Sequence, residues 1–288
     1  MKMKATKVAE NVIKLAVTWK DSNIVKFFLC SDQHFDSKHC DRALLKSHLD
    51  EAKDSNVPIL FFGDWWDAMQ MNTDKRASKS SLRARYMDAY LDDLVDETVE
   101  FLEPYAHNIV MWSWGNHETS ILRHAETKLI TRAIELLRLK TKASICEMPY
   151  RGWVIVHMNY KGGGNATTFK MAYTHGEGGS APVTRGVIKT NRRAVFYPDA
   201  NVVVGGHIHE GWSVSVPRYR ISAKGSVYQD EQLHIQLPTY KTEIMSDGWE
   251  AEKGFGPATK GGVWLNAKMS RANRTETRVA LLTTERAL

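Results

Sequence analysis

The alternation of apolar and polar residues in the first part of the chain predicts strands interleaved with helices. Two β-rich runs, residues 11–19 and 24–30, flank four polar residues and predict a hairpin. Apolar residues then recur at helical spacing over about 41–55, and the segment VPILFFG that follows predicts a buried strand. This rhythm is that of a βαβ unit, so we expect an α/β fold.

The same rhythm continues through the middle of the chain. An amphipathic stretch predicts a helix over about 80–103, and the apolar run 108–114 predicts a strand. A single long helix is expected from Ser120 to Lys140. The strands predicted at 24–30, 57–63 and 108–114 are each followed closely by polar residues, at the edge where open α/β sheets place their sites.

Beyond residue 150 the pattern changes to hairpins. Runs at 151–160 and 167–175 flank a glycine-rich turn, and a second pair is predicted at 212–221 and 231–237. Between the pairs we expect a helix over about 182–194 and a buried strand over 201–207. The signal weakens after residue 247, where short strands are expected at VWLN and RVALLT.

Composition and charge narrow the class of protein. With 43% hydrophobic and 25% charged residues the chain is not disordered, and no stretch approaches the roughly 18 apolar residues of a spanning helix. Three cysteines without regular spacing and a start without an apolar signal core lead us to expect a cytoplasmic protein with no membrane partner. The net charge of +6 permits a polyanionic partner.

Five short blocks carry the candidate chemistry. In chain order they read D-Q-H, G-D-W-W-D, G-N-H-E, T-H-G and G-H-I-H, and each follows a predicted strand or predicted buried run. Carboxylate, imidazole and amide oxygen ligands suit Mn²⁺, Fe or Zn²⁺, and the blocks hold no thiolate. They predict a two-metal hydrolytic site, in which ions roughly 3.5–4 Å apart turn a bridging water into a nucleophile for phosphate esters. Because any boundary between the blocks would divide this site, we expect one domain over 1–288, with a metal-site core at about 24–240 and a C-terminal extension at about 241–288.

The order of these blocks resembles the calcineurin-like metallophosphoesterase superfamily over about residues 24–212. The resemblance implies a four-layer α/β/β/α sandwich of two mixed β-sheets flanked by helices. It further implies two divalent ions, with Mn²⁺ as the expected metal and Fe, Zn²⁺ or Mg²⁺ as alternatives. The first ion would be held by Asp32, His34 and His209, the second by Asn116, His175 and His207, and Asp64 would bridge them.

Two neighbouring residues in the third block are candidate catalytic groups. The resemblance implies that His117 stabilises the transition state or protonates the leaving oxygen, a role that imidazole can fill near pH 7. Glu118 either orients His117 through a carboxylate–imidazole contact or is simply an acidic residue in the first helical turn. The role of Asp67 is open in the same way: it either supports the site or begins a helix.

The substrate is expected to be a phosphodiester, with DNA or RNA as the first candidates. Protein phosphatases of the superfamily usually carry an arginine directly after the G-D-x-x-D block, whereas Ala68 follows Asp67 here. The segments GDWWDAMQ, GNHETSIL and APVTRGVIKTNRRA resemble phage and prophage metallophosphoesterases, and for a phage protein the compartment would be the host cytoplasm. A broad phosphomonoesterase or protein phosphatase is the alternative, and a non-catalytic scaffold is the more distant one.

A basic helix in the second half is the candidate phosphate-binding surface. Cationic residues recur there at three- and four-residue spacing, so they would share one helix face. They are Arg185, Lys189, Arg192 and Arg193. The alternative is that this face is only solvated.

Overall fold

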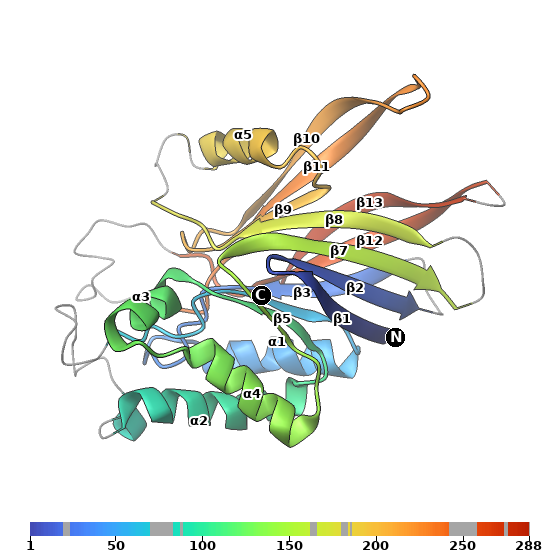
Figure 1. The fold of residues 1–288 in the computed structure, drawn as a ribbon. Helices are drawn as coiled ribbons and strands as arrows, with labels where there is room; N and C mark the ends of the chain where they lie inside the picture. Colours follow the sequence, from blue (N-terminus) through green and yellow to red (C-terminus); the bar gives the residue numbers. More distant parts are fainter. Residues whose placement is uncertain are drawn as a thin grey trace.

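The computed structural model describes residues 1–19, 24–69, 83–86, 89–161, 166–179, 184, 186–241, 258–273 and 276–287. Its strands form two mixed sheets, as expected, with helices beside them (Figure 1). The seven-stranded sheet has the order β1-β2-β7-β8-β9-β11-β10, and the six-stranded sheet has the order β13-β12-β3-β4-β5-β6.

The seven-stranded sheet contains the first two strands of the chain and the five strands from β7 to β11. They are β1 (Lys2–Ala9), β2 (Val12–Trp19), β7 (Arg151–Tyr160), β8 (Thr167–Thr174), β9 (Val202–Gly205), β10 (Trp212–Ile221) and β11 (Val227–Gln236). The six-stranded sheet contains β3 (Ile24–Cys30), β4 (Ile59–Phe62), β5 (Ile109–Ser113), β6 (Cys146–Met148), β12 (Gly262–Asn273) and β13 (Glu276–Ala287). Strands β3 to β6 are parallel neighbours, as are β8 and β9.

The two sheets pack face to face around one apolar core. Alternate residues of many of the strands point into it, among them Phe27 and Leu29 of β3, Val154 and Val156 of β7, and Met171 of β8, all fully or almost fully buried. This alternation is the period-two signal that identified the strands in the sequence. The core holds the carboxyl ends of β3, β4, β5, β8 and β9 at one edge of the sandwich.

Helices cover the outer face of the six-stranded sheet. They are α1 (Arg42–Asp54), α2 (Tyr90–Leu102), α3 (Asn116–Ala125) and α4 (Leu129–Thr141), and a second apolar core forms beneath them. On the outer face of the other sheet lies α5 (Val187–Phe196), on the opposite side of the molecule in Figure 1. A small cluster of Ala172, Ala200 and Val203, packed against Trp153 and Tyr197, fills the space near it.

Three predictions about the first half differ from the structure. The runs 11–19 and 24–30 do not form a hairpin, because β2 pairs with β1 and β7 in one sheet while β3 pairs with β4 and β12 in the other. The predicted helix over 120–140 is two helices, since Glu126 adopts a left-handed conformation (φ 51°) that ends α3. The helix expected over 80–103 begins only at Tyr90, after the short 3₁₀ turn η2 (Ala84–Tyr86).

The hairpin predictions for the second half are confirmed. β7 pairs antiparallel with β8, and β10 pairs antiparallel with β11. The C-terminal strands are longer than expected, because β12 and β13 pair with each other and β12 also adds to β3. Within the described part of the chain, no helix combines the length and apolar character needed to cross a membrane.

Candidate metal centre

Each candidate ligand block directly follows the carboxyl end of a strand. Asp32 lies two residues after β3, Asp64 two residues after β4, and Asn116 three residues after β5 at the start of α3. In the other sheet His175 follows β8 at once, and His207 lies two residues after β9. Because these strands are parallel within each sheet and the sheets face each other, all five blocks meet at one edge.

Backbone hydrogen bonds continue the strand pairing into the loops. The Asp32 amide donates to the Gly63 carbonyl at 3.0 Å, and the His34 amide donates to the Asp64 carbonyl at 3.2 Å. In the other sheet the Gly206 amide donates to the His175 carbonyl at 2.7 Å. The loops are therefore held at fixed separations, which pre-organises the side chains that they carry.

The backbone of these loops is strained at the candidate ligands themselves. Asp32, His34, Asp64, His207 and His209 all have positive φ, between 47° and 77°. Such left-handed conformations cost roughly 1–2 kcal/mol for residues with a Cβ and are concentrated at functional sites. Since glycine would be cheaper at each of these positions, the side chains must serve a purpose there.

One group of potential ligands contains Asp32, His34 and His209. Their ligand atoms all lie within 4.8 Å of one another, and His34 Nε2 lies 3.1 Å from His209 Nε2. Asp32 Oδ1 lies 3.4 Å from His209 Nε2, while its Oδ2 accepts the His207 amide at 2.9 Å. Asp32 therefore has one oxygen fixed by the protein and one directed at the imidazoles.

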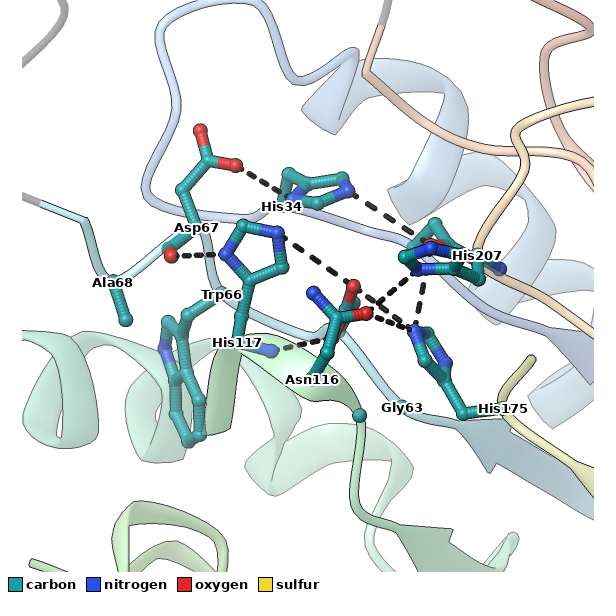
Figure 2. Close-up of polar contacts among 12 residues, drawn as sticks. His34, Gly63, Trp66, Asp67, Ala68, Asn116, His117, His175 and His207 are labelled. Atoms are coloured by element: carbon teal, nitrogen blue, oxygen red, sulfur yellow. Dashed lines mark hydrogen bonds and ion pairs between the residues drawn. The ribbon is translucent and has the colours of Figure 1, made fainter. Parts of the chain in front are cut away.

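A second group contains Asp64, His175 and His207, again with ligand atoms within 4.8 Å of one another. His175 Nε2 lies 3.0 Å from both Asp64 Oδ2 and Asn116 Oδ1, and His207 Nδ1 lies 2.7 Å from Asn116 Oδ1 (Figure 2). A third group, Asp64 with His34 and His117, joins the other two. The structure thus brings all seven sequence-predicted ligands together, with Asp64 between the two groups.

The Nε2 atoms of several imidazoles point toward carboxylates and toward other imidazoles. His175 Nδ1 lies 2.7 Å from the Phe62 carbonyl, so it must donate its proton there. His34 Nδ1 lies 2.7 Å from Asp67 Oδ1, an ion-pair contact rather than a well-formed hydrogen bond. In a neutral ring with its proton on Nδ1, Nε2 carries a lone pair, and the Nε2 atoms of both residues face carboxylate oxygens and other imidazoles. In metal-binding histidines, the ring nitrogen that does not bind the metal contacts a carbonyl or carboxylate in this way, and that contact orients the ring.

Two buried carboxylate oxygens complete that picture. Asp32 Oδ1 and Asp64 Oδ2 accept no well-formed hydrogen bond from the described residues, although imidazole nitrogens lie close by. A buried charge left in this state is costly unless a cation or proton compensates it. The donor set of carboxylate, imidazole and amide oxygen therefore fits divalent ions, and residues of all three groups could hold them.

The pKa values show how charge is balanced among these side chains. Burial alone would lower the pKa of His175, but the carboxylates of Asp64 and Asp32 raise it to about 10. Burial alone would raise the pKa of Asp32, but the charges of His175 and His209 lower it to about 2. The pKa of His34 and that of His207 are both lowered, chiefly by burial. Because metal ligands must be deprotonated, a cation bound here would displace the His175 proton.

His117 stands at the edge of the groups with one nitrogen directed into them. Its Nδ1 donates to the Asp67 carbonyl at 2.5 Å, and its Nε2 lies 3.7 Å from Asp64 Oδ2 (Figure 2). Burial would lower the pKa of His117, but the charges of Asp64 and Asp67 raise it. With 14% of its side chain exposed, it is more accessible than Asp64 at 1%.

Of the two alternatives for Glu118, the structure shows the acidic residue in the first turn of α3, and no contact between its carboxylate and the His117 ring is found among the described residues. Its two oxygens instead accept backbone N–H groups from Asp64 at 3.1 Å, Trp65 at 2.7 Å and Gly115 at 2.9 Å. Burial first, and the charge of Asp64 second, raise the pKa of Glu118 to about 7. Glu118 is therefore a positioning residue that ties the loop after β4 to the start of α3.

Asp67, whose role the sequence left open, supports both neighbouring histidines. Its Oδ1 lies 2.7 Å from His34 Nδ1, and its carbonyl accepts His117 Nδ1–H. Two further residues that hold it were missed in the sequence. Asp36 accepts the Asp67 amide at 2.6 Å, and Lys241 Nζ lies 3.1 Å from Asp67 Oδ2. Asp36 extends the first block to D-Q-H-F-D, a readable signal, whereas Lys241 is 174 residues from Asp67 and has none.

The predicted phosphate-binding helix is only partly as expected. Lys189 is half-buried and donates to the Glu177 carbonyl at 2.9 Å, in the loop that follows His175. Arg192 is exposed, and Arg185 lies outside the described residues. Arg193 is 8% exposed, packs against Gly205 and donates to Gln236 Oε1 at 3.3 Å. The expectation of a substrate contact is therefore corrected for Arg193, which instead supports the end of β9.

Comparisons with known proteins give likenesses of fold alone. No protein-family model and no curated protein matches the chain. Among solved structures, vacuolar protein sorting 29 from Cryptosporidium parvum aligns at 13% identity with a TM-score of 0.40, covering 91% of this chain and 98% of that one. The Zn²⁺ complex of the Entamoeba histolytica protein of that name aligns at 9% identity with a TM-score of 0.37, over the same 91% and 98%.

A conserved protein of Streptococcus pneumoniae described as a predicted phosphoesterase aligns at 10% identity with a TM-score of 0.33, covering 91% of this chain and 98% of that one. At these identities and TM-scores the likenesses carry no assignment of activity. The chemistry of the site therefore rests on its own side chains.

Proposed function

We propose that the chain is a two-metal phosphoester hydrolase of the calcineurin-like type, which cleaves phosphodiesters in nucleic acids or nucleotides. The observation that carries the proposal is the meeting of three overlapping ligand groups at one edge of the sandwich. Their buried carboxylate oxygens lie close to imidazole nitrogens, yet Asp32 Oδ1 and Asp64 Oδ2 accept no well-formed hydrogen bond from the described residues. Only cations or extra protons make this arrangement stable.

The groups divide naturally between two ions. Asp32, His34 and His209 would hold the first, and Asn116, His175 and His207 would hold the second. Asp64 would bridge them, because it belongs to the group that links His34 with the second set. Bound divalent ions, with Mn²⁺ as the expected metal, supply activation of water and stabilisation of negative charge on phosphoryl oxygens.

The chain's own residues would orient the reacting groups. Asp67 Oδ1, 2.7 Å from His34 Nδ1, and the Phe62 carbonyl, 2.7 Å from His175 Nδ1, would favour the Nδ1–H form of both rings, in which the Nε2 atoms are directed inward as ligands. His117, with Nδ1–H fixed on the Asp67 carbonyl, presents Nε2 at the accessible side. It would bind the leaving-group oxygen or protonate it there.

Two features favour a diester substrate. Ala68, not an arginine, follows Asp67, and its backbone amide is held by Asp36 at 3.1 Å. This position therefore offers no cation to grip the doubly charged end of a phosphomonoester. The net charge of +6 and the exposed Arg192 agree with a polyanionic substrate.

The experiment compares bis-p-nitrophenyl phosphate with p-nitrophenyl phosphate as substrates in Mn²⁺. We expect faster turnover of the diester, and loss of turnover and of bound metal in Asp64→Asn. Asp96→Asn, an exposed residue of α2, makes the same chemical change far from the ligand groups and should behave as wild type. Faster monoester turnover would favour a phosphomonoesterase, and metal binding without turnover of either ester would favour a scaffold.

A further inference from the structure

The outer face of the seven-stranded sheet is strongly cationic over β1, β2, β7 and β8. Residues of these strands alternate between the core and this face. Five exposed cations point outward from it, and no outward position of the four strands is Asp or Glu. The five are Lys2, Lys4, Lys14, Arg151 and Lys170. We call this surface the basic sheet face.

Strand register brings the cations of the basic sheet face close together. Lys14 lies opposite Ile155, and Ile155 lies opposite Lys170, so one strand separates the two lysines. With strands about 4.8 Å apart, their Cα atoms are about 10 Å from each other. Lys2 and Lys4 are about 7 Å apart along β1. Charges at these spacings can all lie near phosphates of one nucleic-acid backbone.

The five cations of the basic sheet face have no carboxylate partner on it. On other faces several exposed cations do meet carboxylates, as Lys46 meets Asp50 at 2.6 Å and Lys140 meets Glu103 at 3.1 Å. Among the described residues, none of the five cations of the basic sheet face forms an ion pair. Their mutual repulsion is therefore relieved only by solvent or by a bound anion.

Protection of a sheet edge does not explain this pattern. β1 is an edge strand, and lysines there discourage pairing with another chain, which would account for Lys2 and Lys4. Lys14, Arg151 and Lys170 lie on inner strands, where no edge needs protection. The cations thus follow the face of the sheet rather than its edge.

The basic sheet face is open over β1 and β2, where no helix of the described part of the chain covers it (Figure 1). Over β7 and β8 the segment after α5 covers part of it, because Tyr197 packs against Trp153 and Ala172 is fully buried. Arg151 pairs with Thr174, the residue before His175. The face therefore runs from the edge that carries the candidate ligands toward Lys2 at the far end of the sheet.

We propose that the basic sheet face binds the sugar–phosphate backbone of a nucleic acid and delivers one of its phosphodiesters to the metal centre. The inference rests on the proposed function and specifies its substrate as a polynucleotide rather than a small nucleotide. Few aromatic side chains are exposed on the face, so binding is to phosphates and independent of base sequence.

The test compares two triple variants that remove the same charge. Lys4→Gln, Lys14→Gln and Lys170→Gln neutralise the basic sheet face, whereas Lys26→Gln, Lys46→Gln and Lys140→Gln neutralise three exposed, paired lysines elsewhere. Binding of a fluorescent 30-residue DNA or RNA is followed by anisotropy over a range of NaCl concentrations, without added Mn²⁺. Melting temperatures verify that both variants are folded.

We expect the first variant to lose about 10- to 100-fold in affinity near 0.1 M salt, with the slope of log K against log salt reduced by about 2 to 3. The control should remain close to wild type. Equal losses in both variants, or no loss in the first, would overturn the proposal. So would binding of phosphatidylserine vesicles, but not of DNA or RNA, to the wild-type protein.

Hydrolysis of bis-p-nitrophenyl phosphate separates this inference from the proposed function. The first variant should cleave this small diester at the wild-type rate, because a diester bound at the metal centre is too small to reach the basic sheet face. The wild-type protein could cleave no ester while the first variant still binds nucleic acid more weakly than wild type, as expected. That result would refute the proposed hydrolase activity and support the proposed binding face.

Discussion

A single methyl group added at Gly115 tests whether the position of Asp64 controls the candidate metal centre. A Cβ at Gly115 would lie 2.8 Å from Asp64 Cγ and closer still to Asp64 Oδ1 and its backbone N. Carbon atoms in contact are about 3.5–4.0 Å apart, so Asp64 must move by about 1 Å. Gly115 has φ −111°, which any residue adopts, so the effect of Gly115→Ala is steric.

The magnitude follows from the contacts that this movement breaks. Asp64 Oδ1 accepts the His117 amide at 3.0 Å, and the Asp64 amide donates to Glu118 Oε2 at 3.1 Å. Hydrogen bonds to charged groups contribute about 1.5–3 kcal/mol each. Allowing for partial relaxation, we expect Gly115→Ala to lower the free energy of unfolding by about 3–5 kcal/mol. A displacement of about 1 Å at a reacting centre also lowers turnover by about 10²-fold.

Three measurements on one preparation check this prediction. Urea unfolding gives the free energy of unfolding, calorimetric titration with Mn²⁺ gives the number of bound ions, and bis-p-nitrophenyl phosphate gives turnover. Gly179→Ala is the matched control, because among the described residues no atom lies within 4 Å of a Cβ placed there. A Gly115→Ala protein with wild-type stability, metal content and turnover would refute the reasoning that Asp64 is held in place by close packing.

Three further predictions concern other residues. His117→Asn should leave Mn²⁺ binding intact and lower turnover about 10²–10⁴-fold, less for nitrophenyl than for alkyl leaving groups; an equal loss for both would exclude proton donation. Addition of Mn²⁺ to chelator-treated protein should raise its melting temperature, and an equal rise in Asp64→Asn would contradict the bridging role. Burial first, and then the charges of Arg193 and Arg218, lower the pKa of His234 to about 4 from a value of 6.5. Because the unfolded chain binds this proton more readily, the free energy of unfolding should decrease as the pH is lowered from about 6.5 to about 4. His234→Gln should make the decrease between pH 7 and pH 4.5 smaller by about 2 kcal/mol. Identical urea midpoints of the wild-type protein at both pH values would disprove this prediction.

Local patterns in the sequence were sufficient to predict most strands and to predict that the ligand blocks lie together at one edge of the sheets. Apolar runs such as that of β4 end directly before Gly63 and Asp64, and parallel strands place their carboxyl ends together. The hairpins β7–β8 and β10–β11 were also predictable, because their partners are close in sequence. The strand β1 was missed, since its residues alternate weakly and most are exposed.

The contacts of individual polar side chains could not be predicted as well from the sequence. Helical spacing placed Lys189 and Arg193 on one face of a helix, but it could not show that this face packs on β9 and buries Arg193. Glu118 is adjacent to His117 in the sequence, yet its side chain points to the backbone amides of Asp64 and Trp65. Such contacts depend on where a second element lies, and spacing within one element carries no information about it.

The sequence by itself therefore determined the strand-by-strand order of the fold and the kinds of ligand atom brought to one edge, because both follow from short-range periodicity and from the end of each strand. Only the tertiary structure decided which sheet each strand joins. β2 and β3 are adjacent in the chain and equally apolar, but they pair with β7 and β4 in different sheets. It also decided that Asp67 is held by Lys241, 174 residues away. Long-range pairing is selected by the packing of the whole core, which no local pattern of residues encodes.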